Sequence, residues 1–164
     1  MKDIRFERLE AKHRNGVIEI FNHYVENSTA AYRGERVGNG FFENFVEHID
    51  VYPGYAIIDG DDTILGFCLL EPFMPISTFK EVAEITYFID KDATGSGIGT
   101  RVLGRLEEDA KSMGIRKLVA NISSDNDKSI RFHVRNGFVE YGRLKDAGYK
   151  FGNYFDIVYM VKDI

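Results

Sequence analysis

The stretch from Ala93 to Leu103, ATGSGIGTRVL, places three glycines within five positions, directly before a helical pattern. The stretch Val82 to Asp90, VAEITYFID, precedes it and is rich in β-branched and aromatic residues, which predicts a strand. The helix that follows ends at Gly114 and carries one apolar stripe at helical spacing, made of Val102, Leu103, Leu106, Ala110 and Met113. The glycines therefore join a strand to the start of a helix.

Three kinds of phosphate-binding loop compete for these glycines. A P-loop needs a lysine after its glycines, and Gly97-Ile98-Gly99-Thr100 has none. A dinucleotide loop needs a glycine where Thr100 stands and an acidic residue at the end of the next strand, which instead ends in Ile122-Ser123-Ser124. A glycine turn whose backbone N–H groups and helix N-terminus hold a pyrophosphate remains, and it needs no charged side chain. A plain strand-to-helix turn explains the glycines equally well.

The rest of the chain alternates strand and helix patterns. The residues predict strands at 4–9, 55–59, 63–70, 117–122, 138–144 and 154–162, and helices at 17–25, 38–49 and 125–137. The segments 55–59 and 63–70 flank the turn DGDD and predict a hairpin. Because no linker divides these elements, we expect one α/β domain on a mixed sheet over residues 1–164.

Composition limits the possible functions of the 164-residue chain. No apolar run approaches the ~20 residues that cross a bilayer, and the start MKDIRFERLE has no apolar signal-peptide centre, so we expect a cytoplasmic protein without a membrane partner. The net charge of −5 lacks the excess of basic residues that is typical of nucleic-acid-binding domains, so we expect no nucleic-acid partner. No spacing of His, Cys or carboxylates suggests a metal site. Cys68 lies in the apolar run LGFCLL and is expected to be a buried structural thiol.

With its surroundings, the glycine stretch resembles motif A of the Gcn5-related N-acetyltransferase (GNAT) superfamily, Arg/Gln-x-x-Gly-x-Gly/Ala. The matching residues are Thr94 to Gly99, with Thr94 where the family has Arg or Gln. The stretch NDKSIRFHVRNGF, Asn126 to Phe138, is similar to the family's Asn-x-x-Ser followed by an aromatic residue or His and then Gly-Phe. The phosphinothricin N-acetyltransferase branch also shows segments like FNHYVENSTAAYR (21–33), VAEITYFI (82–89) and AGYKFGNYFD (147–156), in the same order.

The resemblance implies a GNAT-like fold, α/β (α+β), with a mixed, mostly antiparallel sheet of about seven strands flanked by about four helices. It implies acetyl-coenzyme A (acetyl-CoA) as co-substrate, with its pyrophosphate on the glycine loop and its pantetheine along the preceding strand. The cofactor-binding residues it implies are Thr94, Gly95, Ser96, Gly97, Ile98, Gly99 and Thr100 of the loop, the backbone of Tyr87, Phe88 and Ile89, and Asn126 and Ser129. Asn126 is also placed to cap the helix that follows it.

Acetyl transfer to an amine needs a neutral amine and often an acid for the leaving thiolate. Glu84 lies on the strand before the loop among apolar neighbours that would raise its pKa, and the resemblance favours it as a base, acting directly or through water. His133 corresponds to a histidine in that branch and is a candidate proton donor. The alternatives are that Glu84 only points to solvent and that His133 is a core residue whose hydrogen bonds are made within the protein. Because Cys68 is expected to be buried, we expect direct transfer in a ternary complex.

A zwitterionic amino-acid substrate would present a carboxylate. Arg33 or Lys150 could pair with it, and Tyr32, Tyr149 and Tyr154 could wall the pocket; surface charges beside core aromatics explain these residues equally well. The leading hypothesis is an N-acetyltransferase acting on a small amino acid or analogue such as phosphinothricin, methionine sulfone or methionine sulfoximine. The alternatives are a protein or peptide acetyltransferase and a non-catalytic acetyl-CoA sensor.

The resemblance also implies a homodimer. The apolar closing strand YFDIVYMV, 154–161, is a candidate for the interface, and burial in the core explains that strand equally well.

Overall fold

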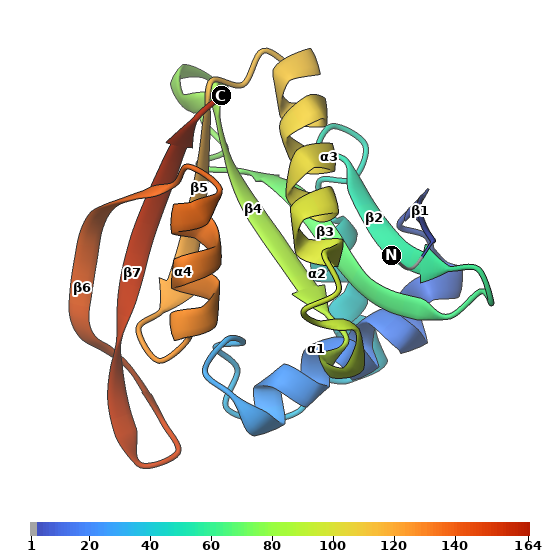
Figure 1. Ribbon diagram of the computed structural model, residues 1–164, viewed down its shortest axis with the longest axis horizontal. Helices are drawn as coiled ribbons and strands as arrows, with labels where there is room; N and C mark the ends of the chain where they lie inside the picture. Colours follow the sequence, from blue (N-terminus) through green and yellow to red (C-terminus); the bar gives the residue numbers. More distant parts are fainter. Residues whose placement is uncertain (1–2) are drawn as a thin grey trace.

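The computed structural model describes residues 3–164. Its centre is a seven-stranded sheet in the order β1-β2-β3-β4-β5-β7-β6 (Figure 1). The strands are β1 (Ile4–Arg8), β2 (Gly54–Asp59), β3 (Ile64–Pro72), β4 (Val82–Ile89), β5 (Lys117–Ser123), β6 (Val139–Lys150) and β7 (Asn153–Asp163). Neighbouring strands are antiparallel except β4 and β5, which are parallel. The expected mixed, mostly antiparallel sheet is confirmed.

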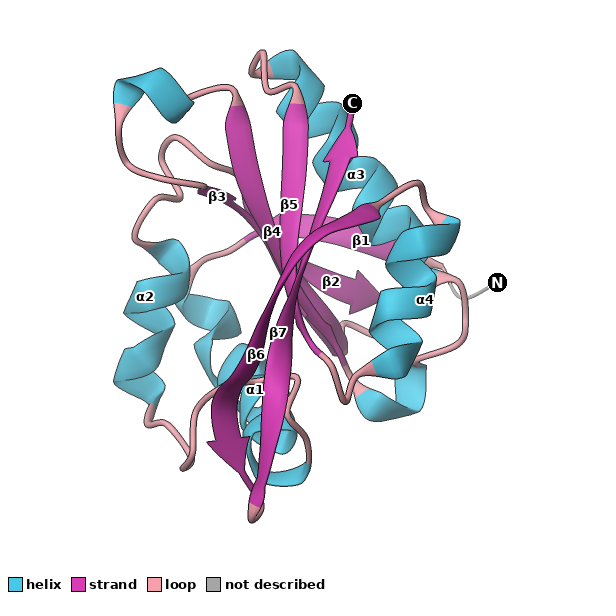
Figure 2. Ribbon diagram, turned by 90° about the vertical axis from the view of Figure 1, so that its left-hand side faces the viewer, coloured by secondary structure: helices cyan, strands magenta, loops and turns pink. Residues whose placement is uncertain are grey.

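Two helices cover each face of the sheet (Figure 2). The helices are α1 (Arg14–Asn27), α2 (Phe42–Val46), α3 (Ile98–Ser112) and α4 (Asp127–Arg135). The stripe that predicted α3 is buried, with Val102 and Leu106 fully enclosed against β3 and β4, while Met113 is exposed. The opposite core packs Phe21 of α1 and Phe42 of α2 with Phe67 of β3. The helix predicted at 38–49 is shorter than expected, because its first turn is a 3₁₀ turn, Asn39–Phe41.

The strands β4 and β5 separate soon after they meet. Pairing is limited to Val82–Glu84 of β4 and Lys117–Val119 of β5, although β4 continues to Ile89 and β5 to Ser123. Figure 1 shows the two strands diverging, with the loop into α3 at the wide end of the gap. The sheet is therefore open at its centre, on one edge of β4.

The hairpin of β6 and β7 is longer than the sequence predicted. Its two-residue turn, Phe151-Gly152, has φ of 52° and 78°, as the hairpin turns that match the strand twist require. Residues 145–150 show no alternation of apolar and polar side chains, so the sequence does not predict this part of the strand. In the structure β6 is an edge strand, and its register shifts between Leu144 and Gly148. A Cβ at Gly148 would lie 2.1 Å from the ring of Phe155, so only glycine fits there.

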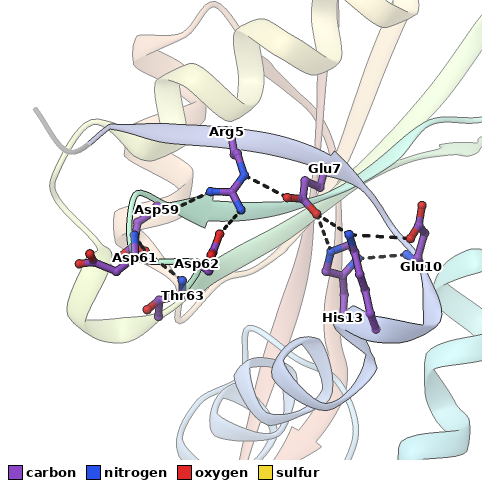
Figure 3. Close-up of polar contacts among 9 residues, drawn as sticks. Arg5, Glu7, Glu10, His13, Asp59, Asp61, Asp62 and Thr63 are labelled. Atoms are coloured by element: carbon purple, nitrogen blue, oxygen red, sulfur yellow. Dashed lines mark hydrogen bonds and ion pairs between the residues drawn. The ribbon is translucent and has the colours of Figure 1, made fainter.

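A polar network ties the N-terminal strand to its neighbours (Figure 3). The Arg5 guanidinium donates to the carbonyl of Asp59 over 2.9 Å and pairs with Asp62 in the β2–β3 turn. The buried His13 accepts from the Glu10 amide, so its Nε2–H faces Glu7 over 3.2 Å. Hydrogen bonds from Lys12, Arg5 and His13 lower the pKa of Glu7 to about 2. These groups satisfy one another away from the open centre of the sheet, so the cluster is structural.

Within residues 3–164, no helix has the length and apolar character needed to span a membrane.

Candidate active site

A cleft of about 1420 Å³ occupies the gap between β4 and β5. This volume exceeds the ~300–1,000 Å³ of an ordinary small-molecule pocket. Residues 84–89 of β4 and 120–123 of β5 form its sides, and the glycine loop and α4 form its ends. Most of the predicted site residues line it: Tyr32, Arg33, Glu84, Tyr87, Phe88, Ile89, Thr94, Gly95, Gly97, Gly99, Thr100, Asn126, Ser129 and His133.

The glycine loop presents backbone to the cleft. Gly95 and Gly97 have φ of 76° and 84°, the left-handed region that glycine adopts without strain. Gly97 is the N-cap of α3, and within the described chain no side chain caps that helix. The amide groups of the first turn of α3 therefore remain available to an anion, with the positive end of the helix dipole behind them.

Loop side chains mainly stabilise the loop itself. The Thr94 hydroxyl donates to the Lys91 carbonyl over 2.9 Å, and the Ser96 hydroxyl donates to the Ala93 carbonyl over 2.6 Å. Ile98 is buried in the core beneath α3. Ser96 and Ile98 lie outside the lining of the cleft, so the loop would hold an anion through its backbone.

Glu84 lies where β4 leaves β5. Its Oε1 accepts a hydrogen bond from Asn121 Nδ2 of β5 over 2.8 Å. Glu71 of β3 is its direct cross-strand partner, and the Glu71 carboxylate accepts from the Thr86 hydroxyl over 2.9 Å. Burial and then the negative charge of Glu71 raise the pKa of Glu84, against the opposing effect of the Asn121 hydrogen bond. A carboxylate in this environment is a better proton acceptor than one in water.

His133 contacts the side chain of Tyr87. His133 Nδ1 lies 2.7 Å from the Ser129 carbonyl and must donate to it, so Nε2 accepts from the Tyr87 hydroxyl over 2.9 Å. His133 is 3% exposed, and burial lowers its pKa, which favours the neutral ring. Burial also raises the pKa of Tyr87. The pair is therefore uncharged, and Tyr87 is the partner through which His133 meets β4.

Glu84 and Tyr87 lie on opposite faces of β4, because side chains alternate along a strand. Glu84 shares its face with Phe88, which packs beside α1, whereas Tyr87 packs in the core that contains α3. The two predicted catalytic residues, Glu84 and His133, are thus separated by the sheet and share only the gap between β4 and β5. A molecule in that gap can contact both.

Tyr32 and Arg33 follow α1 and line the cleft. The Tyr32 ring stacks on Phe155 of β7 at 6.0 Å, and the Arg33 guanidinium lies 4.6 Å from the centre of the Phe41 ring. Desolvation and then the negative charge of Glu84 raise the pKa of Tyr32 to about 12. Two of the five residues predicted to bind substrate therefore line the cleft, and Tyr32 lies near enough to Glu84 to be affected by its charge.

The other three predicted substrate residues lie outside the lining of the cleft. Tyr149 and Tyr154 contact each other on the β6–β7 hairpin and are 65% and 66% exposed. Lys150 is buried, and its ammonium donates to the carbonyls of Ser28 and Ala31. In this arrangement Lys150 contacts the chain itself and presents no free charge to the cleft.

Asn126 and Ser129 begin α4 at the edge of the cleft. Asn126 Oδ1 accepts from the Ser129 amide over 3.3 Å, so Asn126 caps the helix. The predicted burial of Cys68 is confirmed: it is fully enclosed in β3, and burial raises the pKa of its thiol to about 12. A protonated, enclosed thiol is a poor nucleophile.

Sequence reasoning missed three contributions to the site. Asn121 interrupts the apolar run KLVANI, and this polar residue in a buried strand was the available signal. Only the backbone of Tyr87 was expected to matter, whereas its hydroxyl binds His133. Glu71 has no local signal, since its position opposite Glu84 depends on strand register.

Known proteins share this architecture. The chain is 30% identical over 149 residues to L-methionine sulfoximine/L-methionine sulfone acetyltransferase of Pseudomonas aeruginosa, covering 88% of this chain and 86% of that protein. The N-acetyltransferase of Staphylococcus aureus Mu50 superposes with a TM-score of 0.91 at 27% identity, over 98% of each chain. A phosphinothricin acetyltransferase of Sinorhizobium meliloti, solved with acetyl-CoA, shares the fold with a TM-score of 0.89 at 22% identity, over 98% of this chain and 88% of that one.

The sequence also matches the Acetyltransferase (GNAT) family over residues 17–138, which include the glycine loop, β4 and α4. The chain belongs to this family and is an acetyl-CoA-dependent acyltransferase.

Proposed function

We propose that the protein transfers the acetyl group of acetyl-CoA to the amine of a small amino acid or analogue, of the phosphinothricin, methionine sulfone or methionine sulfoximine type, by direct transfer in a ternary complex. One observation carries this proposal: a single cleft is lined by an uncapped helix N-terminus, by a half-buried carboxylate, Glu84, and by an arginine, Arg33. The names of the methionine sulfoximine and phosphinothricin relatives agree with it.

The residues present fit acetyl-CoA. The backbone of Gly95 and Gly97 and the first turn of α3 would hold the pyrophosphate. Beyond Glu84, the edge of β4 that faces the gap is unpaired with β5, so its backbone would bind the pantetheine in the manner of an added strand. The Ile89 carbonyl accepts from the Tyr24 hydroxyl, and the Phe88 carbonyl lies against Gly66 of β3, which leaves the backbone of Tyr87 as the main contact. Bound acetyl-CoA supplies the acetyl group as a reactive thioester.

Glu84 would take the proton of the substrate ammonium, directly or through one water, because an ammonium has no lone pair with which to attack. Asn121 would hold the Glu84 carboxylate toward the gap. On the other face of β4, Tyr87 and His133 both line the cleft, and the Tyr87 hydroxyl would turn from His133 Nε2 to give its proton to the departing thiolate. Arg33 would pair with the substrate carboxylate.

The test is thiol release from acetyl-CoA with a panel of amino acids, analogues, polyamines and peptides, for the wild type and Glu84→Gln. Glu84→Gln removes the charge and keeps the shape, so loss of turnover with unchanged acetyl-CoA affinity identifies the base. Turnover of peptides but not free amino acids would favour a protein acetyltransferase. Acetyl-CoA binding with no turnover of any acceptor would favour a sensor.

A homodimer stays a prediction, but the strand expected from the sequence to form its interface, β7, is not the one that the structure leaves exposed. The strand β7 lies inside the sheet between β5 and β6, and Phe155, Val158 and Met160 are buried. The edge strand β6 instead exposes Val139, Tyr141 and Leu144. We propose this edge as the interface, and sedimentation that shows a monomer at micromolar concentration would contradict it.

A further inference from the structure

Lys150, the last residue of β6, carries a buried ammonium group without an acidic partner. The residue is 8% exposed, and within residues 3–164 no carboxylate forms an ion pair with it. Its Nζ donates to the carbonyls of Ser28 over 2.7 Å and Ala31 over 2.9 Å, and lies 5.1 Å from the centre of the Phe151 ring. A buried charge is costly unless it is paired and hydrogen-bonded, and here the two carbonyls supply the hydrogen bonds without an ion pair.

The two carbonyls belong to a segment, Ser28 to Arg33, that follows α1. A second tie holds the same segment from another strand: the buried hydroxyls of Thr29 and Ser123 lie 2.7 Å apart, and Ser123 ends β5. Lys150 of β6 therefore holds the backbone of Ser28 and Ala31, and Ser123 of β5 holds the side chain of Thr29 between them. These ties do not form part of any helix or sheet ladder.

The fixed segment leads directly into the acceptor wall of the cleft. Ala30, Ala31, Tyr32 and Arg33 all line it. The stacking of Tyr32 on Phe155 gives the segment a further contact with β7, whereas within residues 3–164 no hydrogen bond or ion pair holds the Arg33 guanidinium, which lies 4.6 Å from the centre of the Phe41 ring. The placement of the Arg33 guanidinium thus depends on the backbone just before it.

We propose that Lys150 is a positioning residue for acceptor binding: by holding the Ser28 and Ala31 carbonyls it fixes Tyr32 and Arg33 in the wall of the cleft that Glu84 also lines, without touching the substrate itself. This inference rests on the proposed function, because it assigns Lys150 to the acceptor half of the same site. Lys150 holds the segment that carries Tyr32 and Arg33, whereas the proposed pyrophosphate site is the glycine loop, so loss of Lys150 is expected to affect the amine and not acetyl-CoA.

The test compares Lys150→Met, which keeps the length of the side chain without its donors, with Lys150→Arg, which keeps a donating cation. Steady-state kinetics with each substrate varied separately should show the KM for the amine raised about tenfold in Lys150→Met, with the KM for acetyl-CoA within about twofold of wild type. Lys150→Arg should recover part of the loss. Equal changes in both KM values, or an unchanged amine KM, would overturn the inference.

Thr29→Val provides a second variant that loosens the same segment from β5 and leaves Lys150 in place. It should produce the same selective rise in the amine KM. A rise confined to the acetyl-CoA KM would contradict the proposed role of the segment.

Hydrogen exchange of residues 28–33, followed by mass spectrometry, gives a readout that does not need turnover. Exchange of these amides should be faster in Lys150→Met than in wild type, while the amides of α3 stay protected. If the wild type acetylates no amine, the proposed function fails, and unchanged exchange at 28–33 would separately overturn the role of Lys150.

Discussion

Asn121 donates a hydrogen bond to Glu84 across the point where β4 and β5 separate, and Glu71 faces Glu84 from the other side. The two neighbours act in opposite directions on the pKa of Glu84: the Glu71 charge raises it and the Asn121 hydrogen bond lowers it. The net effect, dominated by burial, is upward. The proposed base, Glu84, is therefore flanked by two residues whose removal is expected to shift its pKa in opposite directions.

This arrangement predicts the pH dependence of turnover. A base must be deprotonated to work, so kcat/KM falls as pH drops through the raised pKa of Glu84. Glu71→Gln removes the charge that opposes ionisation, so the acidic limb of the profile should move to lower pH. Asn121→Leu removes the donor that favours ionisation, so the limb should move to higher pH.

The measurement is the pH profile of kcat/KM for the wild type and both variants with one amine. The ionisation of the amine itself is common to all three proteins, so differences between the profiles report on Glu84. Shifts in the same direction, or profiles that coincide, would mean that another group controls the acidic limb.

The elements that build the cleft could be predicted, because β4, the glycine loop and α3 each carry a local signal in consecutive residues. The contacts inside the cleft could not. Asn121 and Glu84 are 37 positions apart, and they meet only because three residues of β4 pair in parallel with β5. No periodicity within either strand fixes that register.

Lys150 illustrates a second limit. Its charge, and its place in the segment 147–156 that resembles the phosphinothricin N-acetyltransferase branch, predict a partner for a substrate carboxylate. Its direction is set by the register shift before Gly148 and by the left-handed turn at Phe151, neither of which follows from an alternating pattern. The alternation along β4 does place Glu84 and Tyr87 on opposite faces, so that relationship was available from sequence.

The Tyr87–His133 hydrogen bond predicts coupled kinetic effects. Tyr87→Phe removes the hydroxyl that donates to His133, and His133→Gln removes the imidazole that accepts from it. If the two residues deliver one proton, each variant should lower kcat by about 10²–10⁴-fold, and the double variant should lose little more. The measurement is a double-mutant cycle on kcat, with acetyl-CoA affinity as the control. Additive losses would show that the residues act independently.

The glycine loop predicts a selective effect on acetyl-CoA. Alanine at Gly97 meets no atom within 4 Å, so its cost comes from the left-handed backbone alone, about 1–2 kcal/mol. A loop that relaxes from this conformation turns its amides away, and the KM for acetyl-CoA should rise about tenfold for each ~1.4 kcal/mol of lost binding.

Gly104→Ala is the matched control for this variant. Gly104 lies within α3, also has open space around it, and has no left-handed backbone. Alanine there should stabilise the helix by about 0.5–1 kcal/mol and leave both KM values unchanged. A rise in the acetyl-CoA KM for Gly104→Ala as well would show that the loop conformation is not the cause.

The close approach of Gly148 to Phe155 predicts a defect that begins in the hairpin and reaches the acceptor wall. Alanine at Gly148 would place a methyl group 2.1 Å from the ring, so Phe155 must move and Tyr32 loses its stacking partner. We expect a loss of about 1–3 kcal/mol in the free energy of unfolding, together with a higher KM for the amine. Gly142→Ala, on the same strand with no atom within 4 Å, should change stability by no more than about 0.5 kcal/mol. The measurements are denaturant unfolding and steady-state kinetics on both variants. If Gly148→Ala and Gly142→Ala have the same free energy of unfolding and the same KM for the amine, the Phe155 ring moves aside without disturbing Tyr32 and the prediction is wrong.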